Sequence, residues 1–331
     1  MAGFDRKAIK KLAARQTSDR ASYKEILIHT LVSLAAALLI IGVDYVLTQQ
    51  IGHTGGLSGM GTRSVLETVR TVLQYANLLL VPFWEMGIFY WAIRRARGQQ
   101  TAVGDFLEGL RRFAPVFRLK LIQTVVFGAI YMFCVIISSV VFTLSPLGWP
   151  LIQFVMNNIE DPTAMAMMAD EALMAQMLQM MWPVFIILAL MLIPAMVPLY
   201  YRFRMAEYVI MDKPHTGAIY SLIRSFQLTK GQFVSLLKTD LSYWWFWGLQ
   251  FLSAAFLYLD LLLPALGITA LDLQTQSILC YAASYTVQFV SLVLFRGRIE
   301  TAYALIYNAR NATVPAPKPI MVQPNDPWSE Q

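Results

Sequence analysis

Six long apolar runs are the feature that most constrains how this chain can fold. A helix needs roughly 20 mostly apolar residues to cross a hydrocarbon core about 30 Å thick, and each run is about that long. Hydrophobic residues make up 57% of the chain and charged residues 14%, whereas soluble domains carry about a quarter charged residues. The sequence therefore predicts an all-α, polytopic membrane protein with six transmembrane helices. The predicted spans are residues 26–47, 71–93, 121–144, 182–201, 241–266 and 277–295.

The placement of Lys and Arg predicts how these spans are oriented. Residues 1–25, 94–120, 202–238 and 296–331 hold seven, seven, six and four basic residues, which is 24 of the 26 in the chain. With six spans, all four segments lie on the same face of the membrane. The positive-inside rule places that face in the cytoplasm. We therefore expect a multi-pass protein of the cell membrane with both termini inside.

An internal repeat organises the predicted membrane domain. Residues 81–110 align without a gap on residues 197–226, at an offset of 116. Both segments run in the order proline within a span, basic exit, turn, short amphipathic helix and next span. The apolar residues of the short helices recur at i, i+3, i+4 and i+7, which places them on one helix face. We expect Thr101 and Thr216 to cap these helices, which lie in the cytoplasmic interface with their apolar faces toward lipid.

The domain boundaries follow from charge and proline content. Residues 1–25 are expected to form a basic cytoplasmic segment. Residues 26–310 form the six-span domain, with repeat units at about 71–144 and 182–266. The segment 311–331 is rich in proline, which predicts a disordered cytoplasmic tail.

The basic residues of the two short helices predict a partner. Their positive side chains are expected to face anionic lipid headgroups, while a membrane-protein partner stays an open alternative. A nucleic-acid partner is not expected, because the helix-turn-helix pattern of residues 209–233 is tied to membrane spans at both ends, whereas DNA readers need a free recognition face. The residues expected at headgroups are Arg111, Arg112, Arg224 and Lys230.

Three stretches in the second half of the chain carry specific patterns. The first, "MDKPHTGAIYSLIRSFQLTKGQF" (residues 211–233), combines a D-x-P turn, an apolar helix with a serine, and a lysine-glycine stop. The second, "LLKTDLSYWWFW" (236–247), has a Leu-Ser-aromatic-x-Trp start of a span. The third, "RIETAYALIY" (298–307), follows the last span. The residues that carry the patterns are Asp212, Pro214, Ser225, Lys230, Gly231, Leu241, Ser242, Trp245, Ile299, Glu300, Thr301, Ala304 and Tyr307.

These stretches resemble the signature of the domain-of-unknown-function 975 family. Gly297 and Arg298 depart from it, since proline and tyrosine are usual there. The resemblance covers the second half closely and the first half through the repeat, with Arg97 and Gly98 as an "RG" turn. It implies a bacterial integral membrane protein, frequent in Gram-positive organisms and distantly similar to the membrane domain fused to some glycerophosphodiester phosphodiesterases. It implies neither an established activity nor site residues.

Glu85 is the main candidate for a polar site at membrane depth, because ionisable side chains are costly there. Its expected partners are Arg202, Arg204 or Arg298, each at the cytoplasmic end of another span. Such a group can act as a proton or cation relay or a headgroup clamp, or it can fix helix packing through one ion pair. Prolines inside the neighbouring spans can line a cavity or form ordinary kinks. The predicted site residues are Glu85, Arg202, Arg298 and Glu300, and the prolines are Pro82, Pro194 and Pro198.

Motifs for catalysis and for metal binding are missing from the sequence. It contains neither a nucleophile elbow, a phosphate-binding loop, a zinc-protease motif nor a dinucleotide fingerprint. No two histidines share a predicted helix at metal-ligand spacing. We therefore expect no catalytic residue, cofactor or metal site. The methionine-rich residues 164–181 predict an amphipathic helix on the outer leaflet, with Cu(I) capture as the alternative.

The sequence favours a non-enzymatic function. Our leading hypothesis is a membrane scaffold or transport partner that contacts anionic lipid. The alternative is a small-solute or lipid-type transporter, with its site near Glu85 and the proline-containing spans. An enzyme is the third alternative.

Overall fold

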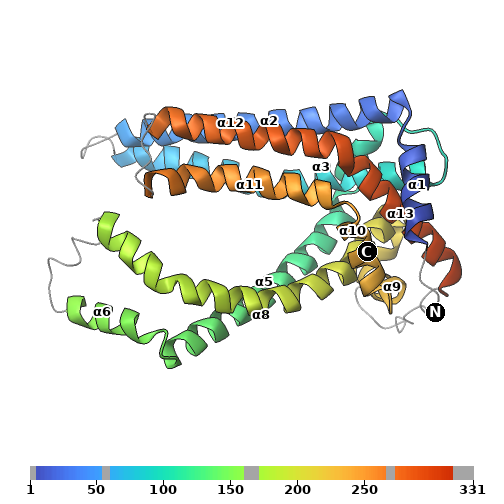
Figure 1. Cartoon of the computed structure of the whole chain (residues 1–331). Coiled ribbons are helices and arrows are strands. Elements are labelled where there is room, and N and C mark those ends of the chain that lie inside the picture. The colour runs from blue at the N-terminus through green and yellow to red at the C-terminus, as the bar shows by residue number, and fades with distance from the viewer. Residues whose placement is uncertain (1–4, 54–59, 160–170, 266–272, 316–331) are drawn as a thin grey trace, which may run out of the picture. The chain divides into compact units, whose positions relative to one another are not determined.

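The computed structural model describes residues 5–53, 60–159, 171–265 and 273–315 (Figure 1). Within these residues the chain is helical and contains no strand, as the apolar runs predict. The elements of the first half are α1 (Arg6–Gln16), α2 (Arg20–His53), α3 (Met60–Ala96), η2 (Val103–Leu107), α4 (Glu108–Arg111), α5 (Phe113–Leu144) and α6 (Trp149–Ile159).

The second half contains three long helices with shorter elements between them. A π-helical turn, η4, separates α12 from α13, so these elements form one continuous helical segment. The elements are α8 (Glu171–Asp212), η3 (Pro214–Thr216), α9 (Gly217–Thr229), α10 (Phe233–Leu241), α11 (Trp244–Ala265), α12 (Leu273–Ser291), η4 (Leu292–Arg296) and α13 (Gly297–Thr313).

Four helical segments of the described chain are long and apolar enough to cross a membrane. They are Arg20–Ile51, Phe113–Leu144, Met180–Asp212 and Thr275–Thr313. These segments contain four of the six predicted spans. The other two, residues 71–93 and 241–266, fall largely within α3 and α11, and their role as spans stays a prediction.

Several helix ends differ from the predicted span ends. The predicted fourth span ends at residue 201, but α8 continues to Asp212. The predicted fifth span begins at residue 241, whereas that residue closes α10 and the long helix begins at Trp244. Hydropathy marks the length of chain that lipid can cover, and a helix can continue beyond it where its side chains pack against other helices. The methionine-rich residues 164–170 and the tail 316–331 lie outside the described residues.

The chain divides into two compact units. The first comprises residues 1–119 and 204–331, and the second comprises residues 120–203. Within the second unit α5 and α8 meet through polar and aromatic contacts. The Ser138 hydroxyl lies 3.6 Å from the Met191 sulfur, and the Phe127 and Phe203 rings meet edge to face at 5.4 Å.

The first unit is built around α13, which packs against α3, α1 and α9. Figure 1 shows α13 in red beside the blue α1. Three tyrosines and a tryptophan at this contact are almost completely buried, namely Trp91, Tyr208, Tyr303 and Tyr307. Burial of a large apolar side chain contributes about 1.5–3 kcal/mol, so this contact is a major source of stability. In the same unit α11 packs on α12 and α2 packs on α3.

The short helical region of the first predicted repeat copy, η2 and α4, touches α3 through two glycines. A Cβ atom on Gly87 would lie 1.9 Å from the Phe106 carbonyl oxygen, and one on Gly109 would lie 1.9 Å from the Phe83 carbonyl oxygen. Only hydrogen fits at these two positions, so η2 and α4 lie directly on the backbone of α3. The predicted cap is wrong here, because Ala102 precedes η2 and the Thr101 hydroxyl donates to Glu25.

The short helix of the second copy is α9, and its end is predicted correctly. α9 closes at Thr229, and Gly231 follows with φ +72°, a left-handed conformation that suits glycine. Thr216 precedes α9 as predicted, but its hydroxyl donates to the Lys213 carbonyl and caps no helical N–H. α8 ends at Asp212, and the short helical turn η3 begins at Pro214 after Lys213.

Candidate functional site

The predicted carboxylate, Glu85, forms an ion pair with Arg296 in the first unit. Glu85 lies on α3, three residues after Pro82, while Arg296 ends the π-helical turn. The two side chains are 27% and 17% exposed. Arg296 is not one of the three predicted partners. The predicted partners were chosen because they lie at the ends of other spans, and that criterion does not tell Arg296 from Arg298. The π-turn that ends at Arg296 changes the face on which each side chain lies.

A second ion pair lies one helical turn further along α13. Arg204 Nη2 lies 3.3 Å from Glu300 Oε2, and both side chains are only 10% exposed. The Tyr208 hydroxyl donates to the same carboxylate at 2.6 Å, and the Arg204 guanidinium covers the Tyr303 ring at 4.0 Å. Because removal of either member would leave a buried charge without its partner, this pair constrains the helices strongly.

Together the two pairs join three helices. The α12–α13 segment presents Arg296 to α3 and Glu300 to α8, four residues apart. It therefore binds the first repeat copy with a positive side chain and the second with a negative one. We call the four residues Glu85, Arg296, Glu300 and Arg204 the ionic clamp.

A buried histidine lies beside the clamp. His29 on α2 stacks on Trp84 at 5.0 Å, with their rings 6° apart, and contacts Phe106 at 4.4 Å. Its side chain is 1% exposed, and neither ring nitrogen has a hydrogen-bond partner among the described residues. Ser33 accepts from Trp84 Nε1 at 2.8 Å and lies 3.5 Å from the Glu85 carboxylate. The sequence offers no signal for this arrangement beyond a polar residue near the start of a span.

The turns of the two repeat copies are tied to each other. Arg97 Nη1 donates to Asp212 at 2.7 Å, and the Tyr307 hydroxyl donates to the other oxygen of that carboxylate at 2.8 Å. Arg112, at the end of the first copy, donates to the Met211 carbonyl. Asp212 and Tyr307 belong to the quoted patterns, and Arg97 belongs to the "RG" turn. These separated patterns thus meet at one place in the first unit.

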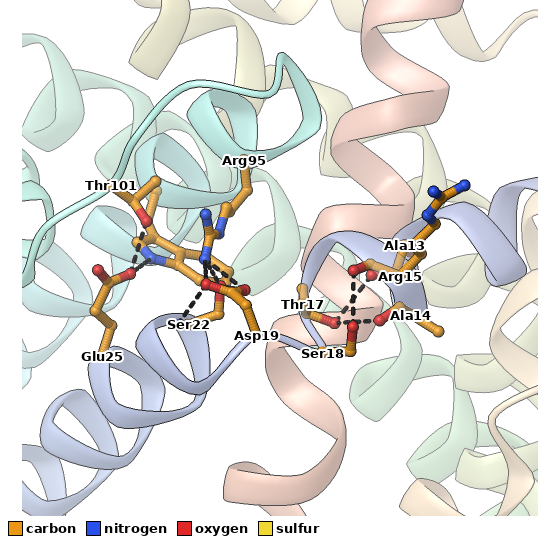
Figure 2. Close-up of polar contacts among 11 residues, drawn as sticks. Ala13, Ala14, Arg15, Thr17, Ser18, Asp19, Ser22, Glu25, Arg95 and Thr101 are labelled. Carbon is orange, nitrogen blue, oxygen red and sulfur yellow. Dashed lines mark hydrogen bonds and ion pairs between the residues drawn. The ribbon is translucent and has the colours of Figure 1, made fainter.

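The start of α2 is anchored to the end of α3 (Figure 2). Asp19 pairs with Arg95 at 2.5 Å and accepts from the Ser22 hydroxyl at 2.5 Å. Burial opposes ionisation of Asp19, but hydrogen bonds from Ser22 and Arg95 outweigh that effect, so the pKa of Asp19 is lowered. Glu25 accepts from Trp91 Nε1 and from the Thr101 hydroxyl, each at 2.7 Å.

The remaining predicted site residues are dispersed. Arg298 is exposed, whereas Arg202 is half-buried and belongs to the second unit. Glu85 pairs with Arg296, and Glu300 lies on the same helical segment as Arg296 and pairs with Arg204, so of the four predicted residues Glu85 and Glu300 belong to one network. Among the described residues, three or more His, Cys, Asp or Glu side chains do not gather in a way that could hold a metal ion.

The predicted headgroup residues fall into two classes. Lys230 and Arg111 are exposed, and Arg111 pairs with Glu108 at 2.8 Å. Arg112 is half-buried, pairs with Glu108 at 3.1 Å and lies 4.7 Å over the Tyr90 ring.

The prediction for Arg224 is wrong. This residue is 3% exposed, and its guanidinium donates to the carbonyls of Val314 and Pro315 and to Asn311, at the end of α13. Periodicity predicted an apolar stripe on α9 but could not tell which side of the helix meets the protein. Arg224 and Ser225 are buried, whereas Ile219 and Ile223 of the predicted stripe are exposed.

A family model described as "Protein of unknown function (DUF975)" matches residues 1–308. No curated protein and no solved structure matches the chain.

Proposed function

Because the chain belongs to the DUF975 family of proteins of unknown function, we propose a function from the geometry of its first unit. The protein is a non-enzymatic, multi-pass membrane protein of the bacterial plasma membrane, and it acts as a scaffold or as a partner of a transport protein. Its six spans place both termini in the cytoplasm, and the two short helices of the repeat lie in the cytoplasmic interface. The four long apolar segments and the basic segments between the predicted spans support this arrangement.

The ionic clamp is the observation that carries the proposal. Each charged group of the clamp has an oppositely charged partner, and the two pairs fix α3 and α8 to a single helical segment. A transport relay instead needs a charged group that can exchange its partner for an ion or a substrate. The closed pairs therefore favour a packing role for Glu85 and a rigid first unit.

The exposed stripes of the two short helices support the interfacial placement. Val103 and Leu107 are exposed on η2, as are Ile219 and Ile223 on α9. Large apolar residues gathered on an outward face favour contact with lipid or with a membrane protein. Lys230 and Arg111 remain available for anionic headgroups, and Arg224 does not.

Stability and flux together test this proposal. We expect Glu85→Gln to lower the melting temperature of the full-length protein by several degrees, because it leaves Arg296 without its counter-charge. Proteoliposomes of the unmodified protein should show no more decay of an imposed pH gradient than empty liposomes. Gradient decay that Glu85→Gln abolishes while the melting temperature stays unchanged would show a transporter instead.

One observation favours that second candidate, a small-solute or lipid-type transporter. A π-helical turn ends at Arg296, and the buried His29 nearby has two unpartnered ring nitrogens among the described residues. π-turns occur frequently at functional sites, and a buried polar group without a partner is costly. Transport through this region requires the Glu85–Arg296 pair to open, which site-directed labelling of a Ser33→Cys variant during the flux assay would detect.

A further inference from the structure

The N-terminal helix α1 is strongly basic and has no acidic residue. Five of its 11 residues are Lys or Arg, and Asp5 caps its N-terminus by accepting from the backbone N–H groups of Lys7 and Ala8. The helix is docked on the first unit rather than free, since it packs against α13 and α3. Ala13 at that contact is completely buried.

Two of the five cations hold α1 in place. Arg6 donates to the Lys238 carbonyl at 3.5 Å, and Lys10 donates to the Ser242 carbonyl at 2.5 Å. Lys10 also lies 4.7 Å over the Tyr243 ring. These carbonyls are at the C-terminal end of α10, where a helix dipole favours positive charge. The docking therefore fixes both the position of α1 and the direction in which its other side chains point.

The other three cations form an outward stripe. Lys7, Lys11 and Arg15 are spaced by four residues, so they share one side of α1, and all three are exposed. No carboxylate of the described residues lies within salt-bridge distance of them. Figure 2 shows the Arg15 side chain extending away from the turn that follows α1. We call these three residues the α1 stripe.

A tryptophan pair lies directly after the docking point. Trp244 and Trp245 follow Tyr243 at the start of α11, stack at 3.8 Å, and are 57% and 59% exposed. Exposed tryptophans at the start of an apolar helix favour the headgroup level of a bilayer. Because Lys10 contacts Tyr243 and Ser242, α1 is anchored at that level, beside the first turn of the predicted span.

We propose that the α1 stripe is an electrostatic contact site for the anionic lipid headgroups of the cytoplasmic leaflet. The proposal rests on the membrane placement proposed above. The α1 stripe takes the place of Arg224, which is buried, as a source of positive charge for the headgroups. Three unpaired cations on a fixed helix complement a negatively charged surface, and each should raise the apparent affinity by roughly five-fold near an anionic leaflet. The interaction falls off within about 10 Å at 0.1 M salt, so the tryptophan pair at the same level is a necessary part of the site.

Full-length protein in nanodiscs tests the proposal. An environment-sensitive fluorophore on Ala8→Cys, an exposed α1 position, reports how closely the helix approaches headgroups. We expect a blue shift when phosphatidylglycerol replaces part of the phosphatidylcholine, and loss of that shift at about 1 M salt, where charge interactions are screened. A second readout is the association of spin-labelled phosphatidylglycerol relative to spin-labelled phosphatidylcholine.

The decisive variant is Lys7→Gln/Lys11→Gln/Arg15→Gln, with Lys7→Arg/Lys11→Arg/Arg15→Lys as the matched control of equal charge. The glutamine variant should lose most of the phosphatidylglycerol preference with an unchanged melting temperature, and the control should keep it. A folded glutamine variant that keeps the full preference overturns the proposal. If the glutamine variant does not fold, the three single glutamine substitutions test the proposal instead. Each of them should lower the preference for phosphatidylglycerol by part of the total.

One further outcome is informative. If soluble polyglutamate shifts the fluorophore but phosphatidylglycerol does not, the stripe binds an acidic protein segment and the lipid proposal is wrong. The test does not depend on whether the protein transports anything, since the flux assay with Glu85→Gln is separate. Failure of the α1 stripe therefore leaves the scaffold proposal standing. Failure of the scaffold role leaves the α1 stripe standing as long as the membrane placement holds.

Discussion

The two short helical regions of the predicted repeat differ in how they are attached to the first unit. At the aligned positions Val103 and Ile219 are 36% and 62% exposed, and Leu107 and Ile223 are 40% and 36% exposed. The same register also places buried residues at matching positions, with Phe106 opposite Leu222. The outward faces of the two copies are thus alike.

The inward faces are different. The first copy lies on α3 through backbone contacts at Gly87 and Gly109, which leave no room for a Cβ atom. The second copy inserts Arg224 into a set of carbonyls at the end of α13. The two regions share the same order of apolar and polar residues, but they are attached to the first unit by different interactions. The first is held by close steric fit and the second by charge-assisted hydrogen bonds. Substitutions at matched positions should separate the two.

The largest effect is expected at the glycine contact. Gly109→Ala places a Cβ atom 1.9 Å from the Phe83 carbonyl oxygen, and backbone cannot move aside as a side chain can. We expect a loss of stability on the order of 3 kcal/mol or more. Ser225→Ala, the aligned position of the second copy, adds no atom and should cost about 1 kcal/mol. Thermal unfolding of both purified variants checks the contrast, and equal losses would contradict it.

The second prediction concerns the buried arginine. Arg224→Gln removes several charge-assisted hydrogen bonds and leaves the Val314 and Pro315 carbonyls without their donor. We expect a loss of about 2–3 kcal/mol and faster hydrogen exchange in residues 309–315. At the aligned position of the first predicted copy, Glu108→Gln weakens an exposed pair with Arg111 and a half-buried pair with Arg112, and should cost about 1 kcal/mol. Exchange that is unchanged in Arg224→Gln would show that the arginine does not hold the end of α13.

The third prediction tests the tie between the copies. Arg97→Gln removes the ion pair with Asp212, in which the arginine side chain is 37% exposed. Because water screens the pair in part, we expect a loss of about 1 kcal/mol. Asp212→Asn should cost more, since the buried Tyr307 hydroxyl also loses its charged acceptor. A double variant no less stable than Asp212→Asn alone would confirm that Arg97 acts through Asp212, and additive losses would show that it does not.

The smallest effect is expected at Asp19, which anchors the first copy through Arg95. The pKa of Asp19 is lowered in the folded protein, so the folded state binds its proton less readily than the unfolded chain does. Its stabilising contribution is present above the unfolded pKa of about 3.9 and is lost as the pH falls through the lower folded value. Asp19 is half exposed, so the contribution stays below about 1 kcal/mol.

The stability difference between the unmodified protein and Asp19→Asn should therefore be constant from pH 5 to 7 and vanish in acid. Chemical denaturation across that range measures it. A difference that grows as the pH falls would mean that the carboxylate is destabilised in the folded state.

The sequence located the long helices well because hydropathy reports what lipid can cover. Residues 121–144 and 182–201 lie inside α5 and α8, as predicted. Helix ends were less predictable, since α8 continues for 11 residues beyond residue 201 before it ends at Asp212. Most of residues 205–211 are buried in the first unit, where Tyr208 donates to Glu300 of α13, so tertiary packing rather than local pattern sets the end.

The polar network was only partly predictable. Composition singled out Glu85 and Glu300 as ionisable groups near apolar runs, but their partners depend on helix register. Arg296, which pairs with Glu85, ends a π-turn. Arg204 was an expected partner of Glu85, but it pairs with Glu300. Arg224 was misplaced for a different reason. An apolar stripe shows which residues share a helix face. In a membrane protein that face can contact either lipid or the protein interior, so the stripe alone does not show which way it points.

A double-mutant cycle on Glu85 and Arg296 tests the structural role of the ionic clamp most directly. Melting curves of Glu85→Gln, Arg296→Gln and the double variant give the coupling energy of the pair. A clamp that fixes packing predicts that each single variant is destabilised and that the double variant recovers much of the loss, with a coupling of about 1 kcal/mol or more. Single variants as stable as the unmodified protein, with no coupling, would contradict the clamp.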